Sequence, residues 1–287
     1  MADPIATLRS SIRSPSDAIR WACVLEATAP KAGNVYPSQS FADLTHVHFV
    51  TAAEITATHL GRSADRISAA MLSAVQATRE ATGTNVNLGI VLLLGPLVAA
   101  EQLVGGSWQS RIAKMLASLD SLDGGNIYSA INVAVAGGLG EVDAMDVSNP
   151  GTEIDIRSAM VLARDRDRIA LQYATDFRDL FDNVVPMVER SIVEAGDMLI
   201  GIARAHVRLL ASAPDTLIER KSGQAVANEV QRNAQAVDVD DPASMQRFDD
   251  SLRSPDHRLN PGTTADLIAA ALYVLLRQNP QATKSST

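Results

Sequence analysis

The feature that most constrains the fold is a helical hydrophobic period that repeats along the whole chain. Apolar residues recur three to four positions apart, as at Ile67, Met71 and Val75, which places them on one face of an α-helix. No part of the sequence shows the sustained alternation of apolar and polar residues that marks a half-buried strand. The pattern predicts an all-α fold, with helices starting after Ser14, near Thr45 and at Ser63, and further helices over residues 88–104, 108–119, 126–136, 158–181, 188–210, 215–236 and 263–276.

Composition favours the same class. Of the 287 residues 46% are hydrophobic but only 4% aromatic, so the core must consist mainly of Ala, Leu, Ile and Val. Such a core suits close-packed helices better than sheets, whose strands are richer in aromatic and β-branched residues. No change of composition divides the chain, so we expect one large all-α domain over residues 1–278 and a polar, disordered tail over 279–287. The polar, acidic stretch 137–150 is expected to be a loop or an active-site lid.

Charge and cysteine content narrow the partners and the compartment. A formal net charge of −8 argues against a nucleic-acid-binding surface. The single cysteine, Cys23, excludes an intramolecular disulfide, and no basic and apolar leader is recognisable, so we expect a cytoplasmic protein. The apolar stretch 89–100 is too short to span a bilayer and contains Pro96, so no membrane association is expected. A homo-oligomer is compatible with these features.

A polar junction between two predicted helices could bind a nucleotide. The segment GTNVNLG (residues 83–89) places Asn85 and Asn87 between two glycines, directly before an apolar helix. Free N–H groups at the start of that helix suit an anion, and the asparagine amides can read a ribose or a base edge beside the backbone of Gly89. The alternative is structural: Asn87 caps the second helix and Gly83 ends the first.

A second junction, EATAPKAGNVYP (residues 26–37), carries charge. Glu26 ends one helix, a non-helical turn follows, and a further carboxylate precedes the next helix. A carboxylate, an ammonium group and a glycine that lets the backbone approach could form a corner for phosphate and metal. An ordinary solvated loop is the alternative. The candidates after Glu26 are Lys31, Gly33, Asn34 and Asp43.

Two adjacent cations, Arg220 and Lys221, lie one turn inside a predicted helix. They could clamp phosphates, because both side chains donate to phosphate oxygens. Alternatively, Glu219 balances them on a solvated helix face.

A last junction, NPGTTAD (residues 260–266), precedes the C-terminal helix. Asn260 is a binding candidate, whereas Thr263 and Asp266 have the spacing of a capping box, which favours a structural role for Asp266. The five histidines, His257 among them, show no zinc-ligand spacing.

Taken together, these segments resemble the triphosphoribosyl-dephospho-CoA synthase family, all-helical transferases that prepare the prosthetic group of citrate and malonate decarboxylating lyases. The resemblance runs in the family's order through Glu26 with TAPKAGNV (residues 28–35), Asp43 in FADL, Ala77-Thr78-Arg79, GTNVNLG, and LNPGTTADLIAAALYVLL (residues 259–276). The chain departs from the family at Ala32, Asn34, Tyr36, Val86 and Leu88. Leu88 replaces a lysine, so Arg79, Arg220 or Lys221 must supply the missing cation, or the substrate has changed.

The resemblance implies transfer of the triphosphoribosyl part of ATP to the 2′-hydroxyl of 3′-dephospho-CoA, with release of adenine. Breaking the N-glycosidic bond implies an oxocarbenium-like transition state, a carboxylate base, a donor to adenine, and charge neutralisation along the triphosphate. It further implies Asp43, then Glu26, as base or Mg²⁺-linked carboxylate. The residues expected to hold phosphate or nucleotide are Lys31, Gly33, Asn34, Arg79, Asn85, Asn87, Gly89, Arg220, Lys221 and Asn260.

Three other readings stay open. A related enzyme could act on another nucleotide or ribosyl phosphate in a different cofactor pathway, which the changes at Val86 and Leu88 would permit. A helical ADP-ribose hydrolase would use similar chemistry, but no Ser-Asp-Asp cluster of the kind that a two-metal centre needs is present in the sequence. The third reading is a non-catalytic nucleotide-binding protein.

Overall fold

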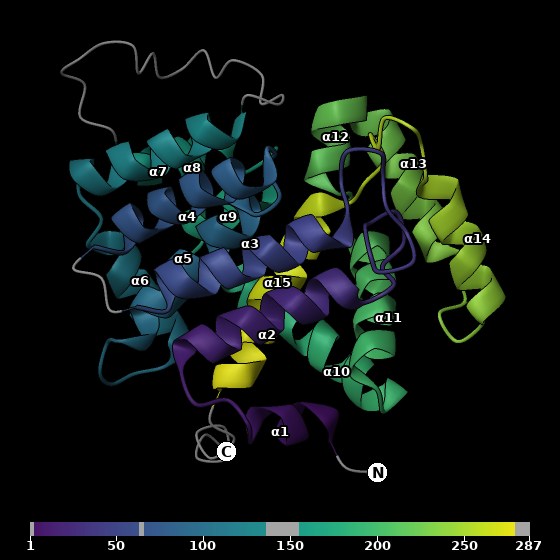
Figure 1. Cartoon of the computed structure of the whole chain (residues 1–287), viewed down its shortest axis with the longest axis horizontal. Coiled ribbons are helices and arrows are strands. Elements are labelled where there is room, and N and C mark those ends of the chain that lie inside the picture. Colours follow the sequence, from purple (N-terminus) through teal and green to yellow (C-terminus); the bar gives the residue numbers. More distant parts are fainter. Residues whose placement is uncertain (1–2, 63–65, 136–154, 279–287) are drawn as a thin grey trace.

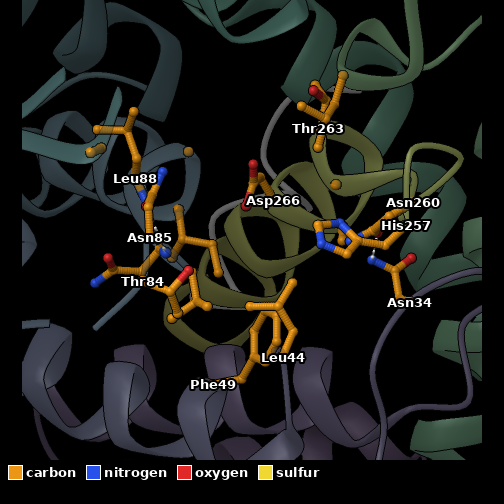
Figure 2. A pocket seen from close by; sticks show the side chains of 18 of the residues that line it. Asn34, Leu44, Phe49, Thr84, Asn85, Leu88, His257, Asn260, Thr263 and Asp266 are labelled. Atoms are coloured by element: carbon orange, nitrogen blue, oxygen red, sulfur yellow. Dashed lines mark hydrogen bonds between the residues drawn. The ribbon is translucent and has the colours of Figure 1, made fainter. Parts of the chain in front are cut away.

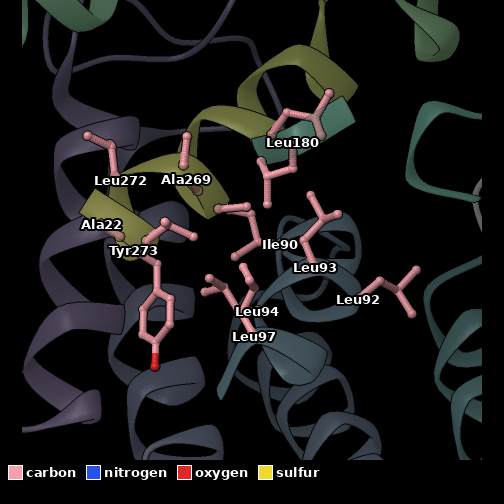
Figure 3. Close-up of a cluster of buried hydrophobic side chains, with 14 of the residues drawn as sticks. Ala22, Ile90, Leu92, Leu93, Leu94, Leu97, Leu180, Ala269, Leu272 and Tyr273 are labelled. Carbon is pink, nitrogen blue, oxygen red and sulfur yellow. The ribbon is translucent and has the colours of Figure 1, made fainter. Parts of the chain in front are cut away.

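Two helices bury most of their residues, and the fold is built around them. α5 (Leu88–Glu101) and α15 (Gly262–Arg277) meet in the main core, where Leu93, Leu94 and Tyr273 are fully buried (Figure 3). Helices that are apolar on most sides are stable only when other elements cover them. The computed structural model describes residues 3–62, 66–135 and 155–278, and all regular elements in these ranges are helices. The predicted all-α class is confirmed.

The remaining helices surround α15, which runs through the middle of the molecule (Figure 1). α2 (Pro15–Thr28) packs on α15, and α3 (His46–Leu60) packs on α2. On one side lie α4 (Ile67–Thr82), α6 (Trp108–Ala117), α7 (Ser121–Val135), α8 (Ile156–Ala163) and α9 (Arg168–Ala174), and on the other α10 (Val185–Ala195), α11 (Met198–Ser212), α12 (Thr216–Ser222), α13 (Gln224–Gln235) and α14 (Pro242–Leu252). A short α1 (Pro4–Arg9) packs against α15 and α10. None of the described helices is both long and apolar enough to cross a membrane.

Helix starts follow the predicted caps where a polar residue precedes the helix. The Ser14 side chain accepts the N–H of Asp17 at 3.1 Å, and Pro15 occupies the first turn of α2. Thr45 is the N-cap of α3. α1 and α14 were not predicted. The predicted lid (137–150) and tail (279–287) lie outside the described residues, so these predictions and the limits of the domain remain untested.

The predicted helix over 158–181 is broken twice and those over 188–210 and 215–236 are broken once each, so these three predictions are wrong in length. The pattern over 158–181 breaks where Asp167 caps α9, and then at Asp176 and Phe177, whose φ angles are 54° and 60°. The patterns over 188–210 and 215–236 break at Gly196 (φ 64°) and Gly223 (φ 87°). Glycine adopts positive φ without the steric cost that other residues have. Apolar periodicity continues across each break and therefore hides it.

A second, smaller core lies among α11, α12, α13 and α14. It holds Phe248 and Leu252 of α14 together with Ala32 from the loop after α2. Because Ala32 inserts into this cluster, the loop between α2 and α3 is fixed against the right-hand helices of Figure 1. This contact brings the second polar junction of the sequence to the start of α15.

Candidate active site

A cavity of about 470 Å³ opens where α5, α12 and α15 begin. It is bounded by the end of α4 and by the loop after α2, so junctions far apart in sequence share one space (Figure 2). Of the predicted site residues, all but Lys31 and Gly33 line it: Glu26, Asn34, Asp43, Arg79, Asn85, Asn87, Gly89, Arg220, Lys221 and Asn260. A cavity of this size and polarity suits a nucleotide.

Gly83 ends α4 with a φ of 71° and Asn87 is the N-cap residue of α5, as the structural alternative predicted. The side chain that accepts an N–H of the first turn belongs to Asn85, however: its Oδ1 accepts the N–H of Leu88 at 3.1 Å. The Asn87 amide is buried and donates to the hydroxyls of Thr56 (3.0 Å) and Thr78 (2.9 Å). Both amide donors of Asn87 are therefore used inside the protein, and Asn85 is the asparagine that remains exposed.

Lys31 is not a solvated phosphate ligand, and that prediction is wrong. Its side chain is fully buried, and Nζ lies 3.0 Å from Oε1 of Glu26 and also donates to the Glu26 backbone carbonyl. Glu26 is buried as well but lines the cavity. The loop folds the ammonium under Glu26 because a buried carboxylate needs a cationic partner. Lys31 can reach substrate only through Glu26.

Gly33 is also held away from the cavity. Its N–H donates to Asp249 Oδ1 at 2.7 Å, and the Tyr36 hydroxyl donates to the other Asp249 oxygen at 2.9 Å. Arg253 binds Asp249 at 2.8 Å and the Asn34 carbonyl at 3.0 Å. Burial, together with the Asp249 carboxylate, raises the pKa of Tyr36 to about 12. This network fixes the loop after α2. Residues 249–253, which supply Asp249 and Arg253, were not predicted to have this structural role.

The network presents one asparagine to the cavity. Asn34 Nδ2 donates to Asn260 Oδ1 at 2.8 Å, which joins the loop after α2 to the residues before α15. Both residues line the cavity (Figure 2).

Asp43 is paired with a histidine that the sequence analysis set aside. His257 Nε2 lies 3.2 Å from Asp43 Oδ2, and the imidazole packs on Phe41 with ring centroids 5.2 Å apart. Asp43 is 67% exposed, at the rim, and both residues line the cavity. His257 has a φ of 40°, an unusual conformation that is enriched at functional sites. Only the strained backbone and the fold reveal this pair.

The start of α15 is capped from another helix. Asp215 accepts the N–H groups of Leu217 (2.9 Å) and Ile218 (3.1 Å) in α12, and both the N–H and the hydroxyl of Thr264 at 2.7 Å. The predicted capping box of Thr263 and Asp266 is therefore wrong: the N-cap of α15 is Pro261 and makes no side-chain bond. Asp266 is free to serve another purpose.

Asp266 lines the cavity beside the first turn of α5. A β-carbon on Gly89 would overlap the Oδ2 atom of Asp266, so glycine is required there for the carboxyl group to approach the helix. Burial, followed by the negative charges of Glu26, Asp215 and Asp167, raises the pKa of Asp266 well above its usual value.

The cations of the cavity are Arg79, Arg220 and Lys221, on α4 and α12. Arg220 lies 3.4 Å from Asp167, which also caps α9. Within the described ranges no three His, Cys, Asp or Glu side chains form a group that could hold a metal ion. A divalent ion bound to Glu26 or Asp43 would therefore need further oxygen ligands, such as those of a bound phosphate.

Comparison with known proteins identifies the family. The chain shares its fold with a crystal structure from Archaeoglobus fulgidus described provisionally as a triphosphoribosyl-dephospho-CoA synthase, with a TM-score of 0.59, 19% identity, and coverage of 80% of this chain and 94% of that chain. No curated protein matches it. The sequence model of the ATP:dephospho-CoA triphosphoribosyl transferases matches residues 12–285, nearly the whole chain. The protein therefore belongs to the ATP:dephospho-CoA triphosphoribosyl transferase family.

Proposed function

We propose that the protein transfers the triphosphoribosyl group of ATP to the 2′-hydroxyl of 3′-dephospho-CoA and releases adenine in this cavity. One observation carries this proposal. Four separate segments of the chain that resemble the family's motifs line the same cavity. Family membership supports the reaction, and the cavity supports the place where it occurs.

The charges of the cavity favour one orientation of ATP. Arg79, Arg220 and Lys221 provide three cations for the triphosphate, which offsets the lysine missing at Leu88. Leu88 itself lines the cavity, so a cation there would have faced the same space. We therefore see no need to invoke a different donor, and the ribose C1′ would lie toward the carboxyl groups of Glu26 and Asp266.

The pair of Asp43 and His257 suits the acceptor. His257 would take the proton of the 2′-hydroxyl, and Asp43 would orient the imidazole and stabilise its cationic form. Asp43 thus takes part in the reaction, but it acts through His257 and is not itself the base. The exposed rim position of Asp43 leaves room for a large acceptor such as dephospho-CoA.

Glu26 would stabilise positive charge at C1′ from its buried position. Its pairing with Lys31 fixes one carboxylate oxygen in a site from which water is largely excluded. We propose that Mg²⁺ enters with ATP, bound to phosphate oxygens, and that the enzyme works in the cytoplasm, in agreement with a single buried cysteine.

The test is a matrix of acceptors. The purified protein is incubated with Mg·ATP alone, with 3′-dephospho-CoA, and with CoA, whose additional 3′-phosphate lies beside the reacting hydroxyl. Adenine release that depends on dephospho-CoA supports the proposal. Release with water alone would indicate a hydrolase, release only with another ribosyl acceptor would indicate a related enzyme, and no release with any acceptor would indicate a binding protein.

A further inference from the structure

We propose that Asp266 is the catalytic acid of this reaction and gives its carboxyl proton to the departing adenine. The inference rests on the proposed function and adds to it the one group that function lacks, a proton donor for the leaving base.

Three of the four carboxyl groups that line the cavity are held by cations or by backbone N–H groups. Glu26 pairs with Lys31 at 3.0 Å. A carboxylate oxygen that is engaged by such a partner is not free to donate a proton to a ligand. The same holds for Asp43, 3.2 Å from His257, and for Asp167, which accepts two N–H groups of α9 and lies 3.4 Å from Arg220.

Asp266 is the exception. Among the described residues it makes no ion pair and no hydrogen bond within 3.5 Å, and the residue is only partly buried, on the wall of the cavity. Its carboxyl group is thus available to a ligand. A group that is left without a protein partner in a substrate cavity is best explained by a partner on the substrate.

The position of Asp266 fits the leaving base. In Figure 2 its side chain lies between the Asn85 and Leu88 side of the cavity and the side formed by Asn34, Asn260 and His257. The missing side chain at Gly89 lets the carboxyl group sit against α5. Asp266 is therefore central among the groups expected to hold the two substrates.

The surroundings favour the protonated form. Burial acts first, and the carboxylates of Glu26, Asp215 and Asp167 add to it, whereas Arg220 opposes them. These effects raise the pKa of Asp266 well above its usual value and so favour its protonated form. A neutral carboxyl also avoids repelling the phosphates of ATP nearby.

The reaction breaks the C1′–N9 bond of ATP, and the electron pair of that bond goes to the adenine ring. The Asp266 proton moves to a ring nitrogen, so adenine leaves uncharged. The acceptor's 2′-oxygen bonds to C1′ and its proton goes to His257. Water then returns a proton from His257 to Asp266, so the net transfer is one proton from the acceptor hydroxyl to adenine.

The experiment compares two donors. N7-methylated ATP carries a permanently charged base, which leaves without being protonated. Asp266→Asn should lower kcat with ATP and dephospho-CoA by at least about 100-fold, the usual contribution of an acid catalyst, but lower kcat with the methylated donor by less than about 10-fold. Asp167→Asn is the matched control, since it removes a cavity carboxyl that serves as a cap, and it should affect both donors by the same factor.

An equal loss with both donors in Asp266→Asn would overturn the acid role while leaving the transferase function intact. Wild-type protein that releases neither base with any acceptor would overturn both. If Asp266→Asn does not fold, wild-type protein gives the answer: release of adenine should fall at alkaline pH as Asp266 ionises, and release of 7-methyladenine should not. The same alkaline decline with both donors would contradict the proposal.

Discussion

Replacing Lys31 with methionine should destabilise the protein strongly at neutral pH and much less in mild acid. The Lys31 side chain is 0% exposed and that of Glu26 5% exposed, with 3.0 Å between Nζ and Oε1. Without its partner, Glu26 must stay charged in the interior or take up a proton. Breaking a buried ion pair costs about 3–5 kcal/mol.

The free energy needed to protonate Glu26 sets the upper limit of that cost. For a glutamate with an unfolded pKa of about 4.3, holding a proton at pH 7 costs about 1.36 × 2.7, or about 3.7 kcal/mol, and at pH 5 only about 1 kcal/mol. In the variant the folded state then binds a proton that the unfolded state releases. The free energy of unfolding of the variant therefore falls as pH rises above about 4.3.

Urea unfolding followed by circular dichroism at pH 5 and pH 7 measures both values. The double variant Glu26→Gln/Lys31→Met, which has no buried charge at this place, should recover most of the stability at pH 7. Lys114→Met, on the exposed surface of α6, is the control and should change stability by less than about 0.5 kcal/mol. A loss for Lys31→Met that is as small as the control's, or equal at the two pH values, would refute the buried ion pair.

Three further predictions concern the cavity. Gly89→Ala should abolish most adenine release with little change in thermal stability, because the methyl group displaces the Asp266 carboxyl group. Gly125→Ala in α7 is the control and should leave adenine release unchanged, because its methyl group would contact no other residue. Arg220→Ala should weaken Mg·ATP binding about 10- to 100-fold in isothermal titration, which is the effect of losing one charge-assisted hydrogen bond. Arg247→Ala, at an exposed position of α14, should leave the affinity unchanged, and equal affinities of the two variants would show that Arg220 does not bind phosphate. Asp43→Asn should lower adenine release at least about 100-fold with the fold intact, and a variant as active as wild type would show that the pair with His257 is not the base.

The fold class could be predicted because helical periodicity is a local property of the sequence. Most of the cavity could also be predicted, since Asn85 and Asn260 stand at polar helix junctions and Arg220 is next to a second cation, a pair that suits phosphate. The resemblance to a family indicated that these separate junctions belong to one site. Periodicity gave too few helix ends, because the apolar pattern continues across Gly196 and Gly223.

The chemistry of individual side chains could not be predicted, because it depends on partners far away in sequence. The bond between Gly33 and Asp249 spans 216 positions, and that between Asp43 and His257 spans 214. Lys31 was expected in solvent because nothing near it in sequence indicates burial, but the second core covers its loop. Asp266 has the spacing of a cap, and only the fold shows that Asp215 already fills that role.

The most direct test of the account is a crystal structure of the protein with Mg·ATP and no acceptor. The account predicts the triphosphate against Arg79, Arg220 and Lys221, and adenine within hydrogen-bonding distance of the Asp266 carboxyl group. It also predicts that the face of C1′ opposite adenine is open toward His257, because the acceptor must approach from that side. ATP bound outside this cavity, or bound in reverse with adenine at Arg220 and the triphosphate at Asp266, would contradict it.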